Sequence, residues 1–143
     1  MQTTVDTEVL MSIHRKHVDA ILAGSKCWEF RRRTALQPGF RVWMYATAPT
    51  KAVLGWFEVG RVVPVNAHSP PRRFIAEGHV SIHDLRQYFA GLEHGVAIEA
   101  KRPGRLTRSV RLPRGESGPQ SYRFITDGAS DRALLRRLKS ATA

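Results

Sequence analysis

The stretch that most constrains the fold of this chain is residues 21–33, ILAGSKCWEFRRR, in which a helix end, a glycine and an alternating strand follow one another. Val18, Ile21 and Leu22 are spaced i, i+3, i+4 and predict one apolar face of a helix. Gly24 comes next, and glycine is the residue type that most readily ends a helix in the left-handed conformation. The sequence therefore predicts a helix that stops at Gly24 and a strand that begins shortly after it.

The strand predicted over residues 26–32 has two chemically different faces, because side chains alternate along a strand with a period of two. Trp28 and Phe30 share one face, which we expect to be buried. Glu29 and Arg31 share the opposite face and are close enough to form a charge pair. What this second face binds is the central question about the function of the chain.

Hydrophobic periodicity and turn signals predict an α+β fold. Further strands are expected at residues 8–13, 40–46, 52–63, 96–101 and 106–112. Helices are expected after Ser12, which is the predicted N-cap, as a short turn at 74–78, over 82–89 behind a capping box at Ser81 and Asp84, and over 130–139. Since the elements do not alternate strictly, we expect a small mixed β-barrel of about six strands with roughly three or four flanking helices. Residues 1–143 would form one domain, with a core at about 8–125 and a basic C-terminal helix at about 129–140.

Charge indicates the class of partner. The chain has 23 Lys and Arg residues against 12 Asp and Glu, which gives a net charge of +11 and a pI near 11.0. Residues 101–114 contain six basic residues and no acidic one, and residues 14–17 (HRKH) place basic side chains in the first turns of a helix, where cations oppose the helix dipole. Such an excess attracts polyanions, so RNA, single-stranded or structured, is the expected partner and an acidic protein is the alternative.

Cellular location is inferred from what the sequence lacks. No apolar run approaches the ~18 residues that cross a membrane, and the polar N-terminus does not resemble a secretory signal. A single cysteine, Cys27, permits no intramolecular disulfide. We therefore expect a cytoplasmic protein without membrane contacts, and the sequence leaves its oligomeric state open.

Three blocks of sequence occur in a characteristic order. A helix ending in IL-x-G-x-K leads into a strand with EFRRR, the segment VWMYATAPTKAVLG follows, and GPQSYRFI comes near the end. Together the blocks cover most of residues 9–125 and resemble the ASCH domain of the PUA-like superfamily. The resemblance implies a small β-barrel with flanking helices, a positively charged cleft, and RNA as the ligand. It further implies metal-assisted cleavage of single-stranded RNA in some members.

The resemblance also implies candidate catalytic residues for a ribonuclease. Tyr45, Lys51 and Ser121 stand where RNA-degrading members have cleft residues. Lys51 could hold a phosphate, Ser121 could donate a hydrogen bond to it, and Tyr45 could stack on a base or relay a proton. Plain structural roles remain open for all three, as an aromatic at the barrel end, an exposed lysine and a turn serine. Any Mg²⁺ cofactor would sit mainly on RNA phosphates, because the histidines are scattered and the acids are few.

The expected RNA-binding residues are Lys26, Glu29, Arg31, Trp43 and Arg123. Glu29 and Arg31 would recognise a base edge or a phosphate, and Trp43 would offer a stacking surface. The alternative for Glu29 and Arg31 is an ion pair that fixes the register of the strand.

Two further chemistries follow from residues 26–29. Lys26 could act as the base of an N4-acetylcytidine amidohydrolase if burial or Arg31 lowers its pKa. Alternatively, the domain could bind a modified base without catalysis. The acetylcytidine-hydrolysing branch has a threonine where this chain has Glu29, which weighs against deacetylation. Cys27 could be a nucleophile, but the sequence places no histidine to activate it.

Overall fold

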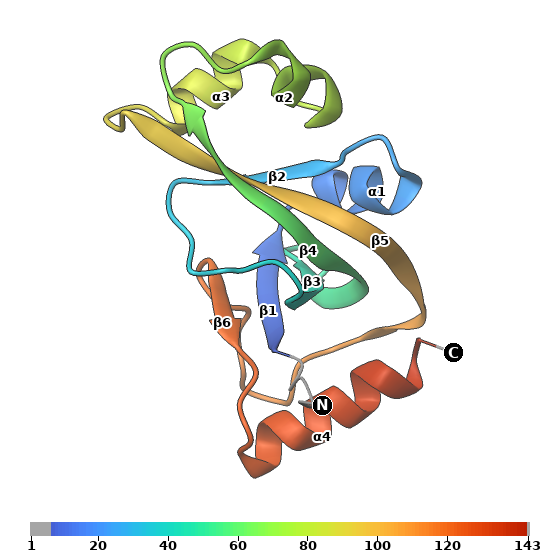
Figure 1. The fold of residues 1–143 in the computed structure, drawn as a ribbon. Coiled ribbons are helices and arrows are strands. Elements are labelled where there is room, and N and C mark those ends of the chain that lie inside the picture. The colour runs from blue at the N-terminus through green and yellow to red at the C-terminus, as the bar shows by residue number, and fades with distance from the viewer. Residues whose placement is uncertain (1–6, 143) are drawn as a thin grey trace, which may run out of the picture.

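The structure of the protein is a computed structural model that describes residues 7–142. Six strands form one mixed, curled sheet in the order β2-β5-β4-β3-β1-β6 (Figure 1). The strands are β1 (Glu8–Ile13), β2 (Trp28–Arg31), β3 (Arg41–Ala46), β4 (Ala52–Asn66), β5 (His94–Val110) and β6 (Tyr122–Phe124). The helices are α1 (Arg15–Ala23), α2 (Arg72–Glu77), α3 (Ile82–Tyr88) and α4 (Ala129–Ser140). The predicted α+β class, with six strands and four helices, is confirmed.

The sheet is an open half-barrel rather than a closed one, with β2 and β6 as its edge strands. β1 pairs with β3 in parallel, and the other neighbouring strands are antiparallel. The long strands β4 and β5 pair along most of their length and contain register shifts, which help the sheet to bend. Because the sheet curls, its edge strand β2 approaches β1 and the segment before β6, which lie at the opposite edge of the sheet.

Three apolar clusters hold the layers together. One lies under α1 and includes Ile21, and a second lies under α4, where Leu134 packs with Trp43 of β3. The third joins the α2–α3 pair to β2 and β5, with Phe30 and Phe74 at its centre. Figure 1 shows the result: α2 and α3 lie at one end of the molecule and α4 lies at the other. No helix within residues 7–142 is long and apolar enough to cross a membrane.

Two predicted helix boundaries are confirmed by cap geometry. Gly24 adopts φ 84° after the last turn of α1, the left-handed conformation that a β-carbon would disfavour. The Ser81 hydroxyl accepts a hydrogen bond from the backbone amide of Asp84 at the start of α3. The N-cap prediction for Ser12 is wrong, because Ser12 lies inside β1, its hydroxyl donates to the Pro119 carbonyl, and α1 begins at Arg15.

The predicted strands at 96–101 and 106–112 are one continuous strand, β5. Arg102, with φ 48°, and the register shifts opposite it bend this strand without ending its pairing to β4. The sixth strand is β6, a segment to which the sequence pattern assigned no secondary structure. The count of six strands was therefore right, although its last two members differ from the prediction.

Candidate functional site

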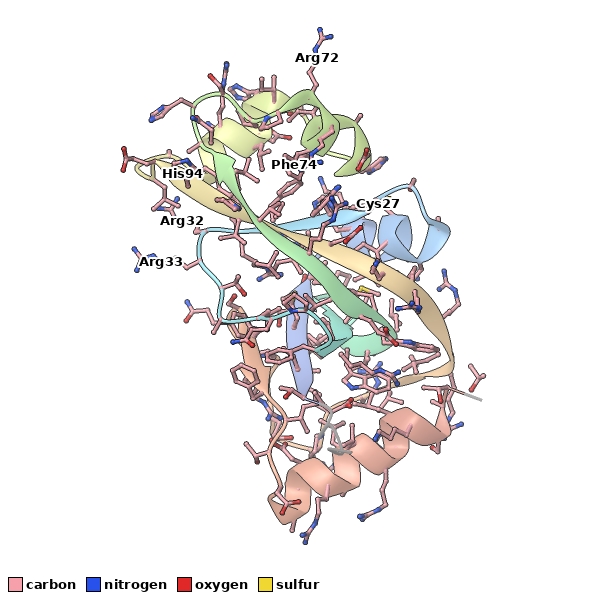
Figure 2. All side chains as sticks on the ribbon, in the orientation of Figure 1. Cys27, Arg32, Arg33, Arg72, Phe74 and His94 are labelled. Carbon is pink, nitrogen blue, oxygen red and sulfur yellow. The ribbon has the colours of Figure 1, made fainter. Side chains whose placement is uncertain are left out.

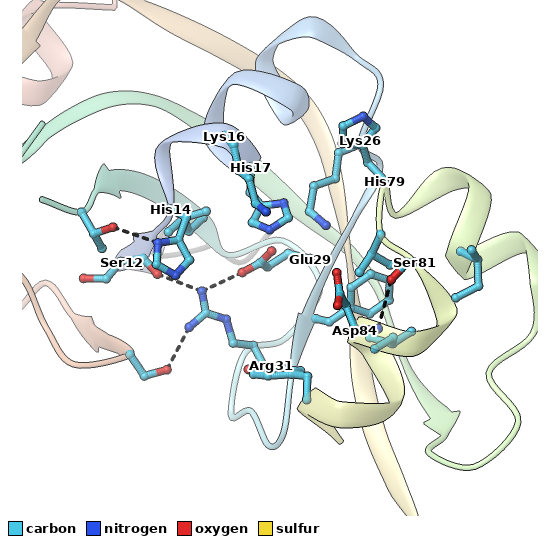
Figure 3. A pocket seen from close by; sticks show the side chains of 18 of the residues that line it. Ser12, His14, Lys16, His17, Lys26, Glu29, Arg31, His79, Ser81 and Asp84 are labelled. Carbon is cyan, nitrogen blue, oxygen red and sulfur yellow. Dashed lines mark hydrogen bonds and ion pairs between the residues drawn. The ribbon is translucent and has the colours of Figure 1, made fainter. Parts of the chain in front are cut away.

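A cavity of about 1120 Å³ opens beside β2, between α1 and the segment that connects α2 to α3 (Figure 3). Its volume is slightly above the range of about 300–1,000 Å³ that is usual for small-molecule sites and is sufficient for a nucleotide. Many of its lining side chains are ionisable, and those most important for its chemistry are His14, Lys16, His17, Lys26, Glu29 and Arg31.

Glu29 and Arg31 form an ion pair on the wall of this cavity, which confirms the predicted shared strand face. Arg31 Nη2 lies 2.7 Å from Glu29 Oε2, and the two side chains are only 11% and 9% exposed. The same guanidinium donates to the Ser12 carbonyl at 3.0 Å and to Ser121 Oγ at 3.1 Å. Arg31 therefore connects the edge strand β2 to β1 and to the residue that precedes β6.

Lys26 is a buried cation at the base of the cavity, with 2% of its surface exposed. Its Nζ donates to the Gly78 carbonyl and lies 4.9 Å from the centre of the Phe30 ring. Burial lowers the pKa of Lys26, the charge of Arg31 acts in the same direction, and Glu29 opposes both. A lysine with a lowered pKa inside a cavity can give or take a proton, and such groups are characteristic of functional sites.

His17 of α1 points into the cavity near Lys26 and Glu29 (Figure 3). Burial, and then the charge of Lys26, lower the pKa of His17 to about 4, so the imidazole is neutral near pH 7. Within residues 7–142, the buried side-chain nitrogens and oxygens that lack a hydrogen-bond partner are His17 Nδ1 and Arg31 Nε, and both belong to lining residues. His17 is not among the site residues predicted from the sequence. Its one signal was the basic run at 14–17, where cations oppose the helix dipole.

The structure separates the three predicted catalytic residues. Ser121 lines the cavity and accepts the hydrogen bond from Arg31. Tyr45 is 7% exposed and packs with the apolar cluster under α4, where a β-carbon on Gly118 would overlap its ring. Lys51 is exposed in the loop after β3, with φ 51°. Ser121 therefore shares the cavity with Lys26, Glu29 and Arg31, whereas Tyr45 and Lys51 lie outside its lining.

Two predicted binding residues have structural contacts instead. Trp43 is 0% exposed, and its Nε1 donates to Glu8 Oε1 at 2.7 Å, so the expected stacking surface is wrong for this residue. The guanidinium of Arg123 binds both oxygens of Asp131 at 3.0 and 3.1 Å. That pair joins β6 to the first turn of α4 and leaves Arg123 little freedom to contact a ligand.

The other residues of 26–33 divide between surface and structure. Arg32 donates to the carbonyls of Tyr88 and Ala90 at 2.7 and 3.0 Å, which attaches β2 to the end of α3. Arg33 projects away from the protein, as expected for a surface charge (Figure 2). Cys27 is exposed and does not line the cavity.

A metal cage made of protein side chains does not fit this site. Within the part of the chain that the structure describes, no three His, Cys, Asp or Glu side chains come together as ligands for an ion. Glu29 is already paired with Arg31, and apart from Asp84 the other charged lining residues are basic. The prediction that Mg²⁺ would be carried on RNA phosphates is compatible with this arrangement and stays a prediction.

No protein-family model matches the chain. A sequence relative from Zymomonas mobilis, described as an ASCH domain-containing ribonuclease, is 30% identical over 124 residues, which cover 82% of this chain and 84% of the relative. The crystal structure of ASCH from Zymomonas mobilis superposes with a TM-score of 0.80 at 27% identity, over 92% of this chain and 94% of the other. Structures of a tyrosine-to-phenylalanine and a serine-to-alanine mutant of that protein superpose equally well, with TM-scores of 0.79 and 0.80. A Pseudomonas putida protein at 14% identity and a TM-score of 0.57, over 92% of this chain and 99% of that one, shares the fold alone.

Proposed function

Because this chain belongs to the ASCH domain family, we propose that it is an RNA-binding protein that takes single-stranded RNA into the cavity beside β2 and cleaves it there. The observation that carries the proposal is the cavity itself, in which the buried Lys26, the ion pair of Glu29 and Arg31, and Ser121 face one space. A relative described as a ribonuclease supports the reaction type.

Phosphate binding would come from the cationic side of the cavity. Lys16 is exposed on α1 and His79 is exposed on the segment between α2 and α3, so these two side chains lie on opposite sides of the opening. The guanidinium of Arg31 and the ammonium of Lys26 add positive charge deeper in the site. Basic lining residues outnumber the two carboxylates, Glu29 and Asp84, so a phosphodiester in the cavity would meet a net positive charge at a depth where solvent screens it less than on the surface.

Base recognition would come from Glu29 and from the aromatic wall. Glu29 is held in place by Arg31 and has acceptor capacity left for an exocyclic amino group of a base. Tyr88 lines the same cavity and is 40% exposed, and an aromatic ring that stacks on a base contributes about 1–3 kcal/mol. These contacts take the place of the stacking role that was expected of Trp43.

For catalysis, Ser121 would donate a hydrogen bond to the phosphate, and Tyr45 and Lys51 would act from outside the cavity lining. Lys51 lies on the loop whose Thr47 lines the cavity, so it can reach RNA that extends beyond the opening. The ring of Tyr45 packs against Gly118, three residues before Ser121, so Tyr45 can influence the position of Ser121. Mg²⁺ bound to the RNA would reduce the charge of the phosphates as they enter the site.

Labelled single-stranded RNA, incubated with and without Mg²⁺, tests the proposal through a gel shift and through the size of the products. We expect binding and cleavage by the wild-type protein, with both reduced in Lys26→Met, which removes the buried amine while preserving most of the side-chain volume. Lys139→Met, at an exposed position of α4 that a short oligonucleotide filling only the cavity does not contact, is the matched control on such a short substrate. Absence of RNA binding and cleavage in the wild-type protein would refute the proposal.

The lowered pKa of Lys26 favours a second candidate, hydrolysis of the amide of N4-acetylcytidine, since a neutral lysine can serve as the base. This chain has Glu29, paired with Arg31, at the position where the acetylcytidine-hydrolysing branch has a threonine. Amide hydrolysis therefore ranks second to RNA cleavage. Incubation with N4-acetylcytidine and measurement of released acetate decides between them.

A further inference from the structure

We propose that His17 is the base that removes the 2′-hydroxyl proton of a ribose bound in the cavity, an inference that rests on the proposed ribonuclease function. The freed 2′-oxygen then attacks the adjacent phosphorus, and the bond from phosphorus to the 5′-oxygen breaks. The 5′-oxygen leaves with a proton from the Lys26 ammonium. One product ends in a 2′,3′-cyclic phosphate and the other begins with a 5′-hydroxyl, so atoms and charges balance without an external nucleophile.

Position is the first argument for this role. His17 lies on the inner side of α1 and projects between Lys26 and Glu29, where a ligand that fills the cavity must contact it (Figure 3). His14 precedes it by one helical turn but is exposed, and its Nδ1 lies 3.3 Å from Thr47 Oγ1 at the rim. His17 is therefore the deeper of the two imidazoles that α1 and its N-cap contribute to this cavity.

The second argument is that one imidazole nitrogen of His17, Nδ1, has no hydrogen-bond partner within residues 7–142. A buried nitrogen without a hydrogen-bond partner costs free energy, and nearly all such groups in folded proteins are paired. His17 Nδ1 and Arg31 Nε lack partners within residues 7–142, and both side chains belong to one cavity. A bound nucleotide that supplies hydroxyl and phosphate groups offers these two side chains the partners that the protein does not.

The third argument is protonation state. The imidazole is neutral because burial and Lys26 disfavour its charged form, so it can accept a proton near pH 7. A phosphodiester that binds beside it adds negative charge, which raises the pKa of His17 toward the range in which a base works best. Lys26, whose pKa burial lowers, is in its protonated form a stronger acid than an ordinary lysine and suits the leaving group.

The fourth argument is the charge around the reacting phosphorus. Negative charge builds on the phosphate oxygens as the 2′-oxygen attacks, and fixed donors stabilise it best when they are already in position. Arg31 is held by three hydrogen bonds, to Glu29, the Ser12 carbonyl and Ser121 Oγ. Its guanidinium is thus a preorganised cation that needs no rearrangement when RNA binds.

The experiment uses three substrates, an RNA oligonucleotide, the same sequence as DNA with a single internal ribonucleotide, and the same sequence as DNA alone. We expect wild-type protein to cleave the chimera only after the ribose, to leave the all-DNA strand intact, and to yield ends that mass spectrometry identifies as 2′,3′-cyclic phosphate and 5′-hydroxyl. His17→Gln keeps the polarity and approximate size of the side chain but cannot accept the proton. It should cleave at least about 100-fold more slowly while it binds RNA with unchanged affinity.

His83→Gln, at an exposed position of α3 outside the cavity lining, is the control and should cleave like wild type. Wild-type rates for His17→Gln, or products with 5′-phosphate and 3′-hydroxyl ends, would overturn the role of His17 while the proposed ribonuclease function stands. A wild-type protein that cleaves no RNA would overturn both.

Discussion

Arg31 Nη1 donates a hydrogen bond to Ser121 Oγ at 3.1 Å, across the opening between the two edges of the curled sheet. The two residues are 90 positions apart in the chain. The same guanidinium binds Glu29 and the carbonyl of Ser12. One side chain thus connects β2 with the far end of the sheet, and it also forms a wall of the cavity in which we place RNA.

Replacement of Ser121 by alanine should affect function far more than stability. Arg31 keeps two of its three partners, and water can reach the exposed position of Ser121, so the free energy of unfolding should fall by less than about 1 kcal/mol. Loss of a hydroxyl that contacts the phosphate should lower kcat/KM for RNA about tenfold or more. Ser109→Ala, at an exposed position of β5, should change neither quantity. Equal kcat/KM values for Ser121→Ala and wild type would remove Ser121 from the site.

Glu29→Gln should destabilise the protein, because it removes one charge of a nearly buried ion pair. The amide oxygen can still accept from Arg31, but the guanidinium then lacks a neutralising charge. We expect the free energy of unfolding in urea to fall by about 2 kcal/mol.

The matched control for this substitution is Asp19→Asn, which breaks the pair of Arg15 and Asp19 on α1. Those side chains are 52% and 48% exposed, and such pairs contribute less than about 1 kcal/mol. Similar losses in the two variants would mean that burial of the Glu29–Arg31 pair has no energetic consequence.

His17 should make stability depend on pH in the mildly acidic range. Its pKa in the folded protein is about 4, below its ordinary value of 6.5, so between these limits the folded state binds fewer protons than the unfolded state. The stabilisation is present above pH 6.5 and is lost as the pH falls toward 4. Because His17 is only half-buried, we expect about 1–2 kcal/mol. Urea unfolding over this range should show a weaker pH dependence for His17→Gln than for wild type or His83→Gln, and parallel curves would contradict a buried neutral His17.

Local sequence rules predicted the parts of the site that depend on neighbours in the chain. Alternation alone was enough to place Glu29 and Arg31 together, because a strand fixes which side chains share a face. The left-handed Gly24 and the Ser81 cap follow from residue types with special backbone or hydrogen-bonding properties. The α+β class followed from the order of the predicted elements, and the ASCH resemblance, which the Zymomonas relative supports, added the family.

Contacts between segments that are distant in the chain could not be predicted from the sequence. The bond from Arg31 to Ser121 depends on how far the sheet curls, and the burial of Trp43 depends on Glu8 and α4 covering one face of β3. In the sequence His17 is one of several basic residues of a helix, and its place in the cavity depends on how α1 packs onto the sheet. Pro103 and Gly104 mark an interruption beside Arg102, but the sequence could not show that β5 bends there and continues its pairing with β4.

Gly118 should be the position where a single methyl group disturbs the Tyr45 side of the site. A β-carbon there would overlap the Tyr45 ring, so either the ring or the segment that leads to Ser121 must move. Gly118→Ala should lower the free energy of unfolding by about 1–3 kcal/mol. Gly128→Ala, whose β-carbon would meet nothing closer than Thr126 Oγ1 at 3.7 Å, is the control and should cost less than about 1 kcal/mol, the effect of alanine as a poorer N-cap of α4. Equal free energies of unfolding for Gly118→Ala and wild type would mean that the Tyr45 ring can move aside without cost.

The exposed basic side chains of α4 should extend the RNA-binding surface beyond the cavity. Arg136 and Arg137 point to solvent, and Arg108 of β5 lies beside them with its Nη2 2.8 Å from Ser140 Oγ. α4 is at the end of the molecule opposite α2 and α3, so only an RNA longer than the cavity can reach both (Figure 1). Each phosphate contact on a single strand contributes a slope of about −0.7 to the dependence of log affinity on log salt concentration.

The variant Arg136→Gln/Arg137→Gln should therefore reduce the salt slope for a long single strand by about 1.4 and weaken its binding at low salt. A short oligonucleotide that fills only the cavity should bind this variant and wild type equally, because it makes no contact with α4. Fluorescence anisotropy at several salt concentrations measures both slopes. Equal slopes for the long strand would confine the RNA to the cavity, and a loss of short-strand binding would show that the substitutions act through the fold instead of through phosphate contacts.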